Sequence, residues 1–308
     1  MPEPIRTPEE QLAWEAERRP RAIVAAFAAA ALVLGGSIYA SVAASRDFPQ
    51  VGLTEAITPA LQGRPSAAID PHVAAARFFD DNAAQLTAGA AISALGTLAM
   101  AYALLYLAEA IRARRPEFQG ALRWLPLIGA VLAAAASIGR PVAFAANARD
   151  YLHGPRAANA LDQISNHGAT PLLNALGIAG QFAIAFAFVL IGLNAMRVGL
   201  LTRFMGVLAI IVGVLFVIPL GPLPIVQAFW LGALAPLFAM RWPAGQPPAW
   251  VTGRAEPWPS ADEVRRRRDA SRAHAEARAI KASPAASEAA EPVRPPHPSS
   301  KKRRKKRR

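Results

Sequence analysis

Apolar residues form long blocks along this chain, instead of the dispersed pattern that is typical of a soluble core. A bilayer core about 30 Å thick needs about 20 apolar residues of helix to cross it. Six blocks of roughly this length are bounded by polar or charged residues, at about 22–44, 86–108, 125–146, 171–195, 204–220 and 223–240. The pattern predicts an all-α fold, a polytopic bundle of six transmembrane helices.

The fifth and sixth blocks are short and are separated only by Gly221 and Pro222. Pro219 and Pro224 lie on either side of this pair, and proline both ends helices and favours turns. We therefore expect these two blocks to form one tight helical hairpin.

The first block has two interpretations. Val42-Ala43-Ala44 offers the small residues of a signal-peptide cleavage site before Ser45. However, the segment before the block contains five acidic residues, and the block is longer than the roughly 7 to 15 apolar residues of a signal peptide. An uncleaved membrane anchor is the favoured interpretation.

Arginine residues indicate the orientation, because short connections rich in basic residues stay on the cytoplasmic side. The outer connections, at about 45–85 and 147–170, carry few basic residues for their length. With the N-terminus inside, the inner segments contain ten arginines, namely Arg6, Arg18, Arg19, Arg21, Arg112, Arg114, Arg115, Arg123, Arg197 and Arg203. This distribution predicts that both termini lie in the cytoplasm. Because the composition is rich in alanine and arginine, we expect a multi-pass protein of a bacterial plasma membrane.

Residues 1–21 precede the membrane domain of residues 22–240. In the sequence Thr7-Pro8-Glu9-Glu10, an N-cap residue is followed by proline at the first helical position and by a capping-box glutamate. This pattern predicts a short cytoplasmic helix that runs to Arg19 and ends before Pro20.

Residues 241–308 form a predicted cytoplasmic tail rich in Pro, Ala and Arg. Trp242 to Pro259 is typical of an extended segment that tryptophans hold near the lipid headgroups. Ser260-Ala261-Asp262-Glu263 is a second capping box and predicts a solvated helix to Ala282. From Ser283 onwards the composition predicts disorder.

The tail also carries most of the charge. The formal net charge of the chain is +13, and the segment from Arg241 to Arg308 holds 18 basic and 7 acidic residues, a net charge of +11. Three interpretations remain: binding to anionic lipids of the inner leaflet, which is favoured, binding to nucleic acid, and a solvated tail that only fixes topology. The predicted membrane-surface contacts are Lys301, Lys302, Arg303, Arg304, Lys305, Lys306, Arg307 and Arg308.

Polar residues inside apolar blocks are candidate functional residues, because burying them in lipid is costly. Arg140 lies near the outer end of the third block, where it either snorkels to the interface or lies at the mouth of a cavity, binding an anion or pairing with Asp80 or Asp81. Asn174 and Gln181 share one face of the fourth block and suit either interhelical hydrogen bonds or substrate contact. Glu109 has the spacing of a helical pair with Arg112.

Small residues on one face of two blocks predict close helix packing. They are Gly89, Ser93, Gly96 and Thr97 on the second block, and Gly177 and Gly180 on the fourth. The chain has no cysteine, no phosphate-binding glycine motif and no GxSxG elbow. The histidines on the predicted outer side have no spacing typical of a metal site on a helix, so no cofactor, metal or catalytic residue is predicted; these are His72, His153 and His167.

The stretch NAMRVGLLTRFMGVLAIIVG, followed by LPIVQAFWLGAL and RWPAGQPPAW, resembles a group of bacterial integral membrane proteins of unknown function. The resemblance covers mainly residues 190–260 and implies a six-helix membrane protein without supplying catalytic residues.

Two non-enzymatic functions fit the sequence: a small carrier, or a membrane-anchored interaction module that uses the basic tail. The alternative is an intramembrane enzyme acting on lipid, which would need His, Asp or Glu residues clustered at one membrane depth. The sequence predicts neither a substrate nor an oligomeric state.

Overall fold

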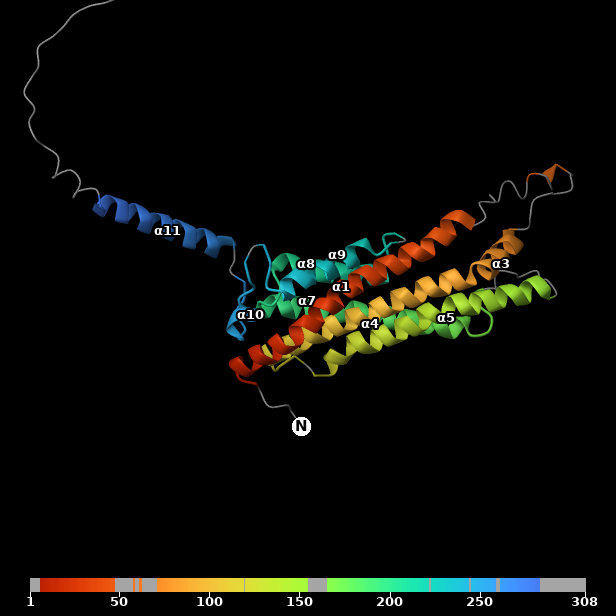
Figure 1. Cartoon of the computed structure of the whole chain (residues 1–308), viewed down its shortest axis with the longest axis horizontal. Helices are drawn as coiled ribbons and strands as arrows, with labels where there is room; N and C mark the ends of the chain where they lie inside the picture. The colour runs from red at the N-terminus through yellow and green to blue at the C-terminus, as the bar shows by residue number, and fades with distance from the viewer. Residues whose placement is uncertain are drawn as a thin grey trace, which may run out of the picture. The chain divides into compact units, whose positions relative to one another are not determined.

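The computed structural model describes residues 6–47, 58, 61–62, 71–118, 120–154, 165–221, 223–243, 245–258 and 261–282 (Figure 1). Within these ranges every regular element is helical, so the all-α prediction is confirmed. One compact unit, Met1–Trp258, contains all the elements but the last, and Pro259–Arg308 forms a second. The α-helices are α1 (Pro8–Asp47), α3 (Pro71–Asp81), α4 (Ala83–Arg114), α5 (Leu125–His153), α7 (Thr170–Val198), α8 (Arg203–Val217), α9 (Ile225–Phe238), α10 (Ala249–Thr252) and α11 (Ala261–Ala282).

Four helices among the described residues are long and apolar enough to cross a membrane: α1, α4, α5 and α7. They coincide with the first four predicted blocks and identify a membrane-spanning protein. Helices α8 and α9 are apolar but have only 15 and 14 residues, lengths of about 22 Å and 21 Å. Each is shorter than a bilayer core of about 30 Å, so the six-span arrangement stays a prediction.

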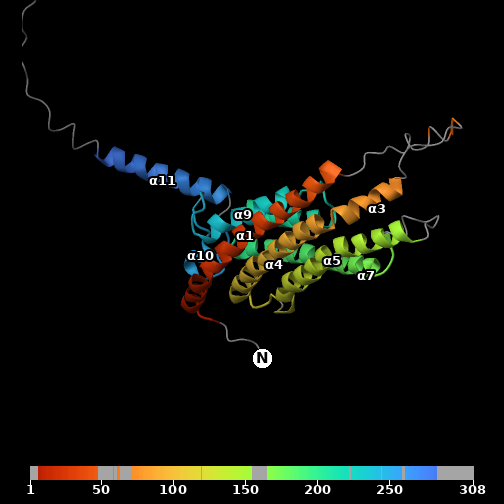
Figure 2. The same cartoon turned by 45° about the vertical axis from the view of Figure 1, so that its right-hand side comes forward.

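The apolar helices of the first unit pack in a closed ring. Helix α1 contacts α4, which contacts α5; α5 contacts α7, which contacts α8; and α8 contacts α9, which returns to α1. A further contact between α4 and α7 crosses the ring. Figures 1 and 2 show that α1, α4 and α5 extend well past the hairpin of α8 and α9. One end of the ring therefore contains fewer helices than the other.

The N-terminal prediction is right about the helix start and wrong about its end. The backbone N–H of Thr7 donates to Glu10 Oε2 over 2.8 Å, and the N–H of Glu10 donates to Thr7 Oγ1 over 3.3 Å, as a capping box requires. Helix α1 then continues through Pro20 without a break. Proline removes one backbone hydrogen bond, but its fixed φ suits a helix, and packing of α1 against α4 and α9 holds both sides of Pro20 in one helix.

The small residues on α4 and α7 lie at helix contacts, as the sequence predicts. A Cβ atom on Gly96 would lie 2.6 Å from the backbone nitrogen of Val33 in α1. A Cβ atom on Gly180 would lie 2.6 Å from the backbone nitrogen of Ala133 in α5. Glycine at these two positions therefore permits the close approach of α1 to α4 and of α5 to α7.

The prediction of an extended segment near the headgroups, from Trp242 to Pro259, is wrong for its central part. This part contains helix α10, and Trp250 is buried against the ends of the long helices. The Trp250 indole N–H donates to the Leu200 carbonyl over 2.9 Å, and the Glu256 N–H donates to the Val198 carbonyl over 3.1 Å. The compact unit thus extends to Trp258, beyond the predicted boundary at residue 240.

The second unit contains α11, which agrees with the predicted helix to Ala282. The side chains described in α11 are exposed, as expected for a solvated helix. The tail from Ser283, including Lys301 to Arg308, lies outside the described residues, as do residues 48–57 and 155–164 of the connections that were predicted to lie outside. Predictions for these segments stay predictions.

Candidate functional site

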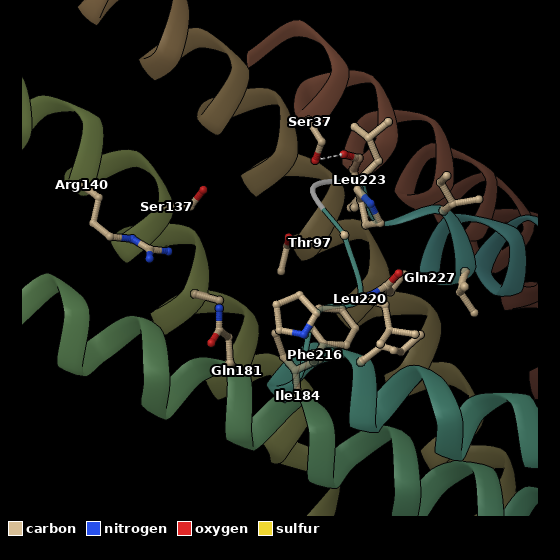
Figure 3. Close-up of a pocket in the computed structure, with 18 residues that line it drawn as sticks. Ser37, Thr97, Ser137, Arg140, Gln181, Ile184, Phe216, Leu220, Leu223 and Gln227 are labelled. Atoms are coloured by element: carbon tan, nitrogen blue, oxygen red, sulfur yellow. Dashed lines mark hydrogen bonds between the residues drawn. The ribbon is translucent and has the colours of Figure 1, made fainter. Parts of the chain in front are cut away.

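A pocket with a volume of about 620 Å³ lies inside the ring (Figure 3). Its lining comes from α1, α4, α5, α7, α8, α9 and the connection between the last two. Most of the lining is apolar, with Ile184, Phe216 and Leu220 among the contributors. The polar lining residues are Ser37, Thr97, Ser137, Arg140, Gln181 and Gln227.

The pocket exists because the hairpin is shorter than its neighbours. Gln181 lies 16 residues before Arg197, which is in the last turn of α7, or about 24 Å along the helix. Leu220, at the hairpin tip, lines the same pocket and follows the end of α8. Helix α7 continues beyond Gln181 for eleven residues to Thr170, about 16 Å further. The long helices therefore extend past the tip, and the tip residues close one side of the pocket.

Arg140 is the one charged residue among the described lining residues. Its side chain is half-buried, and Nε donates to the carbonyl of Ala136 over 3.3 Å. A Cβ atom on Gly177 would lie 3.6 Å from Arg140 Nη2, so the guanidinium lies against a glycine of α7. Figure 3 shows Arg140 with Ser137 and Gln181 on one side of the pocket and the hairpin residues Leu220 and Leu223 on the other.

Proline adds an acceptor beside this arginine. Pro141 lies inside α5 and has no N–H to donate to the carbonyl of Ser137, four residues earlier. The carbonyl of Ser137 therefore lacks its usual helical donor, and Ser137 itself lines the pocket. Arg140 offers donors to a polar ligand, and the neighbouring Ser137 offers acceptors.

The predicted partners of Arg140 are wrong. Asp80 accepts from Arg149 instead, with Nε and Oδ1 2.5 Å apart. Arg149 lies nine residues after Arg140 on α5, closer to the end of the helix against which α3 packs. Arg140 itself forms no salt bridge with any carboxylate of the described residues.

Of the two predicted amides, the pocket includes only one. Gln181 lines it, whereas Asn174 is partly exposed on α7 and does not. Seven residues place both on one face of the helix, but Asn174 lies about 10 Å further along it. The Ser37 hydroxyl donates to the carbonyl of Val33 over 2.8 Å, and the Thr97 hydroxyl donates to that of Ser93 over 2.9 Å. Both hydroxyl groups therefore offer mainly acceptors to a ligand in the pocket.

The opposite end of the ring contains an ion pair that the sequence analysis missed. Arg114 and Glu15 form a bidentate pair, and both side chains are fully buried. Arg114 Nη2 also donates to the carbonyl of Ala249 over 2.6 Å, and Gln11 donates to Glu15 over 2.8 Å. The pair joins α1, α4 and α10.

Aromatic rings surround this pair. Tyr106 stacks between Trp14 and Trp250, with ring centroids 5.7 Å and 5.6 Å away. The Tyr106 hydroxyl donates to the carbonyl of Glu15 over 3.2 Å. The i, i+4 spacing of Gln11 and Glu15 was the available sequence signal, but the sequence does not say that Arg114 is their neighbour.

Glu109 pairs with Arg123 over 3.1 Å, a partner that the sequence did not predict, and the pairing of Glu109 with Arg112 stays a prediction. Arg123 lies in a short 3-10 turn, Gly120–Trp124, that contacts α4. Among the described residues no group of three or more His, Asp or Glu side chains could hold a metal ion.

Comparisons of the chain with protein-family models, curated proteins and solved structures find no match. The resemblance to bacterial membrane proteins therefore stays a prediction, and the functional argument depends on the geometry alone.

Proposed function

We propose that this protein is a membrane carrier that binds a small organic anion in the Arg140 pocket. One observation carries the proposal: Ser137, Arg140 and Gln181, from two neighbouring helices, line one pocket of about 620 Å³ within a ring of apolar helices. This volume lies within the roughly 300 to 1,000 Å³ of small-molecule sites. A solid, dry bundle would instead have favoured the interaction module.

The lining supports an anion with an apolar body. Arginine is always charged, and its planar donors match a carboxylate or phosphate. Because Arg140 has no carboxylate partner among the described residues, a ligand can supply the compensating charge. The apolar lining from Ile184, Phe216 and Leu220 suits a hydrocarbon group attached to that anion.

The proposed orientation keeps both termini inside and opens the pocket to the outside. The inner ends of the long helices are rich in arginine, which favours the cytoplasm. A hairpin that enters from the inner side returns the chain to that side, whether or not its tip completes a crossing. The described lining contains no His, Asp or Glu, which supports binding over proton-transfer chemistry.

Binding of benzoate tests the proposal, because this probe combines a carboxylate with an apolar ring. Purified protein in neutral detergent should bind benzoate more tightly than benzamide, its uncharged analogue. Arg140→Gln should weaken benzoate binding roughly 10- to 100-fold, as expected for a lost charged hydrogen bond. Proteoliposomes that contain the protein should also take up labelled benzoate, and the same variant should slow this uptake.

Arg149→Gln is the matched control, since it removes an arginine from the same helix outside the pocket. It should leave benzoate binding unchanged. The proposal fails if Arg140→Gln and Gln181→Leu bind benzoate as the unmodified protein does, or if Arg149→Gln has the same effect as Arg140→Gln. The interaction module then becomes the preferred function, and deletion of Lys301 to Arg308 should alter lipid capture without affecting insertion.

A further inference from the structure

A second pocket, with a volume of about 280 Å³, lies where α1 and α4 meet the start of α5. It is at the arginine-rich end of the ring, whereas the Arg140 pocket is near the hairpin tip. Its lining includes Trp14, Arg18, Tyr102, Glu109, Arg123 and Trp124. We propose that this pocket binds the phosphate group of an anionic phospholipid, independently of the carrier function.

Two arginines in this pocket are held by stacking on tryptophan. The Cζ atom of Arg18 lies 4.8 Å from the ring centroid of Trp14, and that of Arg123 lies 5.1 Å from the ring centroid of Trp124. The N–H groups of a guanidinium lie in its plane, so stacking leaves them able to donate sideways to phosphate oxygens. The pocket thus presents two preoriented anion-binding groups.

Arg18 has donors left after its salt bridge. Arg18 Nη1 donates to the exposed Glu17 over 3.3 Å, and because a guanidinium has five N–H donors, this one contact does not saturate Arg18. Arg123 Nη1 donates to Glu109 over 3.1 Å. Glu109 holds Arg123 in place, while Arg19 and Arg21 add positive charge close to Arg18 along α1. The combined field favours an anionic headgroup.

The position of the pocket along the helices favours a lipid over a free phosphate ion. Arg123 and Trp124 directly precede the apolar run of α5, and Arg18 precedes that of α1 by one turn. Tyr102 lies seven residues deeper than Glu109, about 10 Å, and Tyr102 and Trp124 are 38% and 47% exposed. Aromatic residues with such exposure are typical of the boundary between headgroups and acyl chains. An acyl chain can therefore lie on Tyr102 while its phosphate contacts Arg18 and Arg123.

Native mass spectrometry of the full chain in neutral detergent tests this inference. Phosphatidylglycerol and phosphatidylcholine with identical acyl chains are the probes, measured at an ionic strength of about 0.5 M to screen the basic tail. We expect one phosphatidylglycerol to be retained per chain, about tenfold more tightly than phosphatidylcholine. Arg18→Gln should weaken this retention about tenfold, the effect of one lost charged hydrogen bond.

Arg241→Gln is the matched control, because it removes an exposed arginine of the same unit outside the pocket. It should retain phosphatidylglycerol as the unmodified chain does. Arg18→Lys keeps the charge but loses the planar fork, and should give an intermediate affinity. The ion pair of Arg18 is with its exposed sequence neighbour Glu17, so Arg18→Gln should fold normally, which its thermal unfolding checks.

Three results would overturn the inference. The first is unchanged retention of phosphatidylglycerol in both Arg18→Gln and the double variant Arg18→Gln/Arg123→Gln. The second is equal retention of phosphatidylcholine, which would contradict the preference for an anionic lipid. The third is displacement of the lipid by inorganic phosphate at similar concentrations, which would assign the pocket to the free ion.

Discussion

Arg114 and Glu15 illustrate at the scale of single residues how a charged pair can be buried in an apolar bundle. The bidentate contact, the Ala249 carbonyl and the Gln11 amide together satisfy most of their polar atoms. Removal of one partner from such a pair leaves an uncompensated buried charge, which costs about 3–5 kcal/mol. Each charge of the pair therefore offsets the cost of burying the other.

The variant Arg114→Met should accordingly be less stable by about 3–5 kcal/mol, because the Glu15 carboxylate would lose its partner. The double variant Glu15→Leu/Arg114→Met should recover most of this loss, since no charge then remains buried. Thermal unfolding in detergent, followed by tryptophan fluorescence, measures both. If the double variant is no more stable than Arg114→Met, the unpaired Glu15 carboxylate is not the cause of the loss. The ion pair itself would then provide the stability.

Single residues also show which parts of the site could be predicted from the sequence. Arg140 and Gln181 could be predicted as pocket residues, because polar groups within apolar runs are conspicuous. Ser137 and Gln227 could not, since a serine within a helix and a glutamine near a turn are unremarkable until the neighbouring helices are known. The pairs of Asp80 with Arg149 and of Glu109 with Arg123 could not be predicted, because the sequence does not say which arginine another segment brings nearby.

At the scale of elements, the contact between α1 and α4 depends on the absence of side chains. Two adjacent glycines of α1 provide a matched comparison. A Cβ atom on Gly36 would lie 2.4 Å from Ser93 Oγ and 2.6 Å from the Gly89 carbonyl oxygen, whereas a Cβ atom on Gly35 would have no neighbour within 4 Å. The two positions differ in packing and not in backbone conformation.

Gly36→Ala should therefore destabilise the protein by forcing α1 away from α4, despite the higher helix propensity of alanine. Gly35→Ala should be neutral or stabilise by up to about 1 kcal/mol. Thermal unfolding of the two variants under identical conditions decides between them. Equal unfolding temperatures would contradict the close packing of α1 on α4.

The elements themselves were mostly predictable. Long apolar runs bounded by arginine predicted α1, α4, α5 and α7, because only a helix satisfies the backbone within lipid. The continuation of α1 through Pro20 and the burial of Trp250 were not predictable, because both depend on tertiary packing. A tryptophan among prolines suggests a headgroup anchor until the helix ends that bury it are known.

At the scale of the whole molecule, the length difference between the hairpin and the four long helices creates the pocket. The ring is filled by six helices at its arginine-rich end and by fewer beyond the hairpin tip. The sequence predicted a short hairpin, but only the order of helices around the ring places its tip beside Arg140 and Gln181. We propose that this tip faces the outside while the chain termini stay inside.

Cysteine labelling tests this claim most directly, because the chain has no cysteine of its own. Gly221 at the hairpin tip has open space around it, and Thr252 is exposed at the opposite end of the ring. We predict that a membrane-impermeant thiol reagent labels Gly221→Cys in intact cells and labels Thr252→Cys only after permeabilisation. Labelling of Thr252→Cys in intact cells, or of Gly221→Cys only after permeabilisation, would contradict the account.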